Sequence, residues 1–142
     1  MAYEQTQVAV PKSQDKIRQM LLRHKGGAVA FISDPPNEGF QAVVPIEGKM
    51  YSVKIVARCR DKRDPEQEAR RIWRVLFHHL KSIFEACDSG VMEFRELMLP
   101  YLMHKNGKTI AEHILPQLDR ALSMRPERLL TSGDPGDTER TI

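Results

Sequence analysis

A long amphipathic segment between Asp64 and Gly90 constrains the fold more than any other feature of the sequence. Asp64 is a typical N-cap residue, Pro65 suits the first helical position, and Gln67 completes a capping box. Apolar residues then recur every three or four positions, which predicts a helix with one buried face. The apolar stripe comprises Ala69, Ile72, Trp73, Leu76, Leu80, Ile83, Phe84 and Cys87, and the opposite face carries Arg70, Arg71, Arg74, His78 and Lys81.

Three runs of β-forming residues precede this helix. They span residues 28–32, 40–46 and 51–58, and short segments rich in Pro, Asn and Gly separate them. Such short connections favour an antiparallel meander, and the alternating pattern of the last two runs predicts one apolar face. Pro45 has no backbone donor, so we expect it at an edge or a bulge. The apolar face of the sheet is the expected contact of the long helix.

Shorter helices are expected on both sides of this core. Ser13 fits the N-cap of a first helix over residues 13–25, which two glycines follow. After the long helix, Pro100 and the turn dipeptide at 106–107 divide the chain into two shorter helical segments.

The sequence therefore predicts an α+β fold. Its expected order is an N-terminal helix, a three-stranded antiparallel β-meander, the long amphipathic helix packed on the sheet, and two shorter C-terminal helical segments. Residues 1–11 are expected to be a flexible N-terminus, residues 12–130 a single α+β domain, and residues 131–142 a disordered tail without apolar periodicity.

Composition excludes several classes of protein. The chain has 142 residues, of which 41% are hydrophobic and 29% charged, as in an ordinary globular domain. No apolar run reaches the roughly 18 residues that a membrane-spanning helix needs, and the first residues lack the features of a secretory signal. Cys59 and Cys87 are too few and too far apart in sequence for a disulfide framework. We therefore expect a cytoplasmic protein with no membrane partner.

The net charge of +3 is unevenly distributed along the chain. Residues 1–27 hold five basic and two acidic side chains, and residues 58–81 hold eight basic and four acidic ones, whereas the rest of the chain is mildly acidic. A basic segment of this kind indicates either an anionic partner or simply a solvated surface. The candidate nucleic-acid contacts are Arg58, Arg60, Lys62, Arg63, Arg70 and Arg74.

The order of one helix, three antiparallel strands and a second helix, with basic residues leading into that helix, is similar to the topology of double-stranded-RNA-binding domains. The likeness concerns topology alone.

Motifs for catalysis are missing from the sequence. None of the five histidines is spaced from another His or a Cys as in a zinc site, and no nucleophile motif or phosphate-binding glycine loop occurs. Cys59 lies between Arg58 and Arg60, where the cations favour its thiolate, but a reactive thiol is not by itself an active site. We therefore expect no enzymatic activity, no cofactor, no metal and no small-molecule substrate.

A scattered set of residues is similar to a pattern found in a family of small, uncharacterised proteins encoded by bacteriophages and prophages. The resemblance implies a compact accessory protein and implies no activity, cofactor or catalytic residue. The residues that carry it are the run 27–34, the run 70–74 with Lys81 and Glu85, Ser89 and Gly90, Phe94, and the run 106–109 with Glu112 and residues 115–117.

Together these features favour a non-enzymatic accessory or protein-interaction protein of the phage or prophage type. Its partner would be another protein or a second copy of the chain. Val75 and Phe77 lie off the apolar stripe of the long helix and are the candidates for self-association, along with a surface formed by Met92, Met98 and Met103. The alternative is a nucleic-acid-binding protein that uses the basic loop and helix face over residues 58–81.

Overall fold

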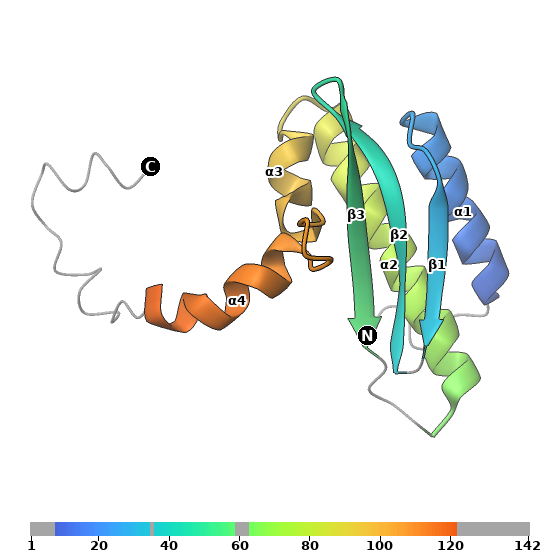
Figure 1. Ribbon diagram of the computed structural model, residues 1–142. Helices are drawn as coiled ribbons and strands as arrows, with labels where there is room; N and C mark the ends of the chain where they lie inside the picture. Colours follow the sequence, from blue (N-terminus) through green and yellow to red (C-terminus); the bar gives the residue numbers. More distant parts are fainter. Residues whose placement is uncertain (1–7, 35, 59–62, 122–142) are drawn as a thin grey trace, which may run out of the picture. The chain divides into compact units, whose positions relative to one another are not determined.

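The computed structural model describes residues 8–34, 36–58 and 63–121, and it has the α+β fold (Figure 1). The chain divides into two units, residues 1–111 and 112–142. The first unit holds the sheet and most of the helices. In chain order the elements are α1 (Val10–Arg23), β1 (Val29–Asp34), β2 (Asn37–Ile46), β3 (Lys49–Arg58), α2 (Pro65–Asp88), α3 (Phe94–Met98), the short 3-10 helix η1 (Leu99–Tyr101) and α4 (Ile110–Ala121).

The three strands form the expected antiparallel meander in the order β1-β2-β3. Phe31 in β1 lies opposite Phe40 in β2, which in turn lies opposite Ile55 in β3. The β1–β2 connection is tighter than expected, since Asp34 already pairs with Asn37.

Pro45 lies in the central strand, beyond the last β2 residue that pairs with β1. The backbone N–H of Val43, two residues earlier, points toward the β1 side, so by strand alternation the nitrogen of Pro45 does too. Its missing donor therefore interrupts no ladder with β3, and the position is locally an edge.

Both α1 and α2 cover one face of the sheet, and the hydrophobic core lies between these two layers (Figure 1). Trp73 of α2 is fully buried and meets Phe31 edge to face, with the ring centroids 5.6 Å apart. The Trp73 Nε1–H donates to the carboxylate of Glu38 over 3.3 Å, and the Ser33 hydroxyl donates to the other oxygen of that carboxylate over 3.1 Å. Glu38 is thus a buried acid held by two neutral donors.

Helix α1 begins earlier than the sequence predicts. Its N-cap is Ala9, which offers no capping side chain, and Pro11 lies in the first turn. A proline costs nothing there because the first N–H groups of a helix have no partner within it. Ser13 is therefore not the N-cap, and that prediction is wrong: the residue lies inside the helix and is fully buried.

Helix α2 begins as predicted, since the Asp64 side chain accepts a hydrogen bond from the backbone N–H of Gln67 over 3.2 Å. Phe77 lies off the stripe that meets the sheet, and it is nevertheless buried, with only 9% of it exposed, so it offers little surface for the self-association that the sequence suggests. The helix packs against α1 as well as against the sheet, so it has a second buried face. Val75 is exposed, as expected.

The segment after α2 returns to the free edge of the sheet. Leu102 forms an isolated bridge with Val53 in β3, and the backbone N–H of Met103 donates to Ser52 over 2.8 Å. Met98 is fully buried beneath this segment, so it cannot belong to the methionine surface that the sequence predicts. The predicted tail over 131–142 lies outside the described residues.

Candidate functional site

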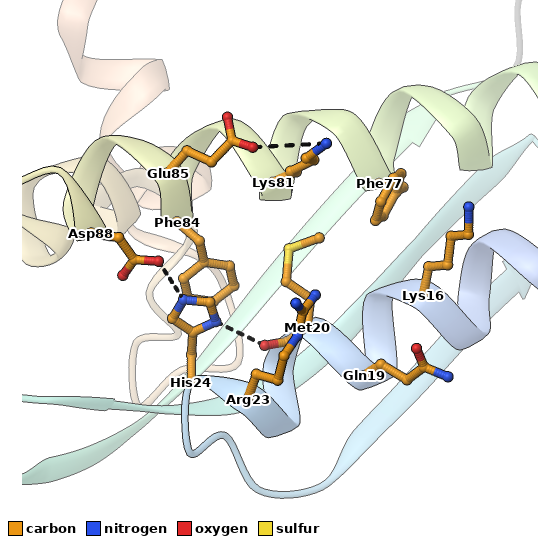
Figure 2. Close-up of a pocket in the computed structure, with 10 residues that line it drawn as sticks. All are labelled: Lys16, Gln19, Met20, Arg23, His24, Phe77, Lys81, Phe84, Glu85 and Asp88. Carbon is orange, nitrogen blue, oxygen red and sulfur yellow. Dashed lines mark hydrogen bonds and ion pairs between the residues drawn. The ribbon is translucent and has the colours of Figure 1, made fainter.

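A groove of about 430 Å³ runs between α1 and α2, on the side of the helices that faces away from the sheet (Figure 2). The two helices run in the same direction along it: Lys16 of α1 lies near Phe77 of α2, and further along His24 meets Phe84 and Asp88. The groove is lined by Lys16, Gln19, Met20, Arg23 and His24 from the α1 side, and by Phe77, Lys81, Phe84, Glu85 and Asp88 from α2.

The apolar floor of the groove offers little surface to a ligand. Met20, Phe77 and Phe84 form that floor, and all three belong to the hydrophobic core. Because their side chains are already buried against neighbours, an apolar ligand would gain little contact area here. The accessible chemistry of the groove is therefore that of its charged walls.

His24 closes one end of the groove and resembles a catalytic histidine at first sight. Its Nε2 lies 3.0 Å from the Asp88 carboxylate, and its ring stacks on Phe84 with the centroids 3.8 Å apart. Its Nδ1, however, lies 2.9 Å from the backbone carbonyl of Met20. Both ring nitrogens therefore contact acceptor atoms of the protein. The contact instead joins the C-terminal ends of the two helices.

Cations from both helices line the outer surface and form what we call the cationic strip. On each helix its members are separated by intervals of three, four or seven residues, which place side chains on one helical face. The strip consists of Lys12, Lys16 and Arg23 on α1 and of Arg70, Arg74 and Lys81 on α2. The two basic segments of the sequence therefore meet in the fold, because α1 packs against α2.

Most cations on α2 have an acceptor nearby. Arg71 forms an ion pair with the buried Glu68, Lys81 lies 3.8 Å from Glu85, and Arg70 donates to the Gln67 side chain over 2.7 Å.

Arg74 differs from these neighbours. Its guanidinium carbon lies 5.0 Å from the centroid of the Phe77 ring, and its Nη1 is buried with no hydrogen-bond partner within the described part of the chain. A buried donor without an acceptor costs about 1–3 kcal/mol. Lys16 approaches the same ring from α1, with its Nζ 5.6 Å from the centroid.

The positive charges of the strip affect the pKa of the nearby His78. The pKa of His78 is lowered from its ordinary value, first by burial and then by the charges of Arg74, Lys81 and Lys16; Glu85 acts in the opposite direction. The ring of His78 meets that of Phe77 edge to face, with the centroids 5.0 Å apart. His78 therefore lies against the same aromatic ring as the two cations.

The structure brings together only some of the residues expected to bind nucleic acid. Arg70 and Arg74 lie on the cationic strip, whereas Arg58 is exposed at the end of β3 and Arg63 is exposed before α2. Arg60 and Lys62 lie outside the described residues, as does Cys59. The sequence reasoning did not count Lys16 and Arg23 among the site residues, although the basic excess of residues 1–27 was the signal that could have identified them.

Of the residues expected to mediate self-association, Val75 and Met92 are exposed, Met103 is half-buried, and Phe77 and Met98 are buried. Cys87 is half-buried, and burial raises the pKa of its thiol, followed by a smaller effect of Asp88.

The described residues contain no cluster of His, Cys, Asp or Glu side chains that could hold a metal ion. No helix among them is long and apolar enough to cross a membrane. Comparison of the chain with protein-family models, with curated proteins and with solved structures finds no match.

Proposed function

We propose that this chain is a non-enzymatic accessory protein that binds the backbone of a nucleic acid through its cationic strip. The observation that carries the proposal is the union of two basic segments, distant in sequence, on one surface of the α1–α2 pair. Lysine and arginine side chains bind the phosphates of nucleic acids without reading sequence, and they release condensed counterions when they do so.

Two features of the groove support this choice over other ligands. Its apolar floor is buried in the core, so the groove suits a charged ligand better than an apolar peptide. The aromatic side chains beside the strip, Phe77 and Phe84, are also buried and present no face for base stacking. Binding to single strands commonly uses such stacking, so the backbone of a duplex is the favoured ligand.

The non-enzymatic part of the proposal rests on the sequence, which lacks motifs for catalysis. A bacteriophage or prophage origin and a cytoplasmic location belong to the proposal on the sequence pattern alone. Binding to another protein, or self-association through Val75, stays a prediction of the sequence.

The test is fluorescence anisotropy with labelled duplex DNA and duplex RNA of the same sequence, over about 50–200 mM salt. If the strip neutralises about four phosphates, a plot of log K against log salt should have a slope of about −3.6. The double variant Arg23→Gln, Lys81→Gln should weaken binding and reduce the magnitude of that slope by about 2. Lys54→Gln is the matched control because Lys54 lies on the face of the sheet away from the helices.

Two results would refute the proposal. One is that neither duplex binds at the lowest salt concentration. The other is that an acidic polypeptide such as polyglutamate, at the same charge concentration, binds more tightly than both duplexes, because an acidic protein would then be the better ligand.

A further inference from the structure

The ring of Phe77 is the meeting point of two positive charges that come from different helices. Lys16 of α1 and Arg74 of α2 both approach the ring, at 5.6 Å and 5.0 Å from its centroid. Figure 2 shows the Lys16 side chain extended from α1 toward α2, at the end of the groove where Phe77 lies. Contact with an aromatic ring stabilises each cation, but it leaves the repulsion between the two charges in place.

Neither charge is neutralised by a carboxylate within the residues that the structure describes. Ion pairs among the described residues include those of Arg71 with Glu68, Lys81 with Glu85, Arg95 with Glu47 and His24 with Asp88. Cations on either side of Arg74 along α2 thus have acceptors, whereas Lys16 and Arg74 have only the ring.

Arg74 also carries a donor that has no acceptor. Its Nη1 is buried and forms no hydrogen bond within the described part of the chain. An oxyanion that drew the guanidinium outward would satisfy this N–H, and the nearby charge of Lys16 would attract the same anion. Guanidinium groups bind phosphate oxygens in a bidentate manner, so a phosphate fits this donor geometry.

We infer that Lys16 and Arg74 form a phosphate-binding subsite above Phe77, and that this subsite takes one backbone phosphate of the nucleic acid. The inference rests on the proposed function, because it names the point on the strip at which the phosphate is held. The remaining cations of the strip attract the nucleic acid along the groove, but they do not share contact with a single aromatic ring as Lys16 and Arg74 do.

His78 provides a reporter for this subsite that needs no nucleic acid. Burial, Arg74, Lys81 and Lys16 lower its pKa, and Glu85 raises it. An anion held between Lys16 and Arg74 would offset the cations, so the pKa of His78 should rise when the subsite is filled. His104, in the turn before α4, serves as an internal reference.

The first experiment is an NMR titration of the His78 ring in sulfate and in chloride at equal ionic strength. Inorganic sulfate is the probe because its charge stays constant over the pH range of the titration. Sulfate should raise the pKa of His78 more than chloride does in the parent protein and in Lys54→Gln. The extra rise should disappear in Lys16→Gln and in Arg74→Gln and should be retained in part in Arg74→Lys.

The near-UV circular dichroism of every variant verifies that it is folded. An equal response to sulfate and chloride in the parent protein overturns the inference. So does an extra rise that persists in both glutamine variants.

The second experiment separates the subsite from the proposed function. Arg74→Gln should weaken duplex binding more than Arg23→Gln does. If Arg74→Gln and Lys16→Gln bind duplex as tightly as Lys54→Gln while the Arg23 and Lys81 double variant binds weakly, the subsite is refuted and the proposed function stands. If sulfate acts on His78 but no duplex binds, the proposed function fails, and so does the assignment of the subsite to a backbone phosphate.

Discussion

Replacement of Ser13 by alanine should stabilise the protein, although it removes a polar group from a helix. The Ser13 hydroxyl is fully buried in α1 and has no hydrogen-bond partner among the described residues. Removal of such a group recovers a desolvation penalty of about 1–3 kcal/mol, and alanine gains about 0.5 kcal/mol of helix propensity over serine. The space left by one oxygen atom costs only a few tenths of a kcal/mol, at about 24 cal/mol per Å³. The net expectation is an increase of about 1–3 kcal/mol in the free energy of unfolding.

Urea unfolding, followed through the fluorescence of the sole tryptophan, Trp73, measures this change. With a denaturant dependence of about 2 kcal/mol per M, the midpoint should rise by roughly 0.5–1.5 M. Ser82→Ala is the control, since Ser82 is exposed on α2 and reports helix propensity alone. If Ser13 capped the helix, its replacement would instead cost about 1 kcal/mol. A decrease in stability, or a gain no larger than that of Ser82→Ala, would therefore refute the reasoning.

Three further predictions follow from the backbone and from charge. Ala9→Asp should stabilise the protein by about 1 kcal/mol in urea unfolding, because α1 has no side-chain cap; an unchanged midpoint would contradict this. Gly39→Ala should lower the free energy of unfolding by about 3 kcal/mol or more, since a Cβ atom there would lie 2.2 Å from the Ile55 carbonyl oxygen. Gly27→Ala is the control and should be tolerated, so equal urea midpoints for the two variants would disprove the prediction. The pKa of His78 is lowered in the folded protein, so the unfolded chain takes up the proton first as pH falls through about 6.5, and folding loses stability. His78→Gln should consequently lose less stability than the parent protein between about pH 8 and pH 5, and parallel pH profiles would exclude this role.

The sequence predicts the elements of this fold better than their packing. The start of α2 is confirmed because capping is local: Asp64, Pro65 and Gln67 interact within one turn. The predicted start of α1 is wrong because Pro11 fits either before a helix or within its first turn. No local signal distinguishes these two positions. Burial of Ser13 depends on how α1 packs against the rest of the fold, and the sequence of α1 alone does not contain that information.

The same limit applies to the candidate site. The apolar periodicity of α2 identifies the face that meets the sheet, but Phe77 is buried against α1, and periodicity within one helix contains no information about a second helix. The two basic segments are visible in the sequence, whereas their adjacency depends on how the helices pack. Lys16 could therefore not be assigned to a site together with Arg74.

The common direction of α1 and α2 also gives the helix pair an electrical polarity. The peptide dipoles make the N-terminus of each helix equivalent to roughly half a positive charge and its C-terminus to half a negative charge. Because the helices run the same way, the dipoles add instead of cancelling, and the carboxylates of Glu85 and Asp88 lie at the negative end. The effect of these dipoles is felt mainly within the first and last turns, so it acts on an anion chiefly at the ends of the groove. If a long polyanion binds in the groove as proposed, the helix C-termini and the Asp88 carboxylate oppose it at their end, which favours a position toward the turn that holds Arg74.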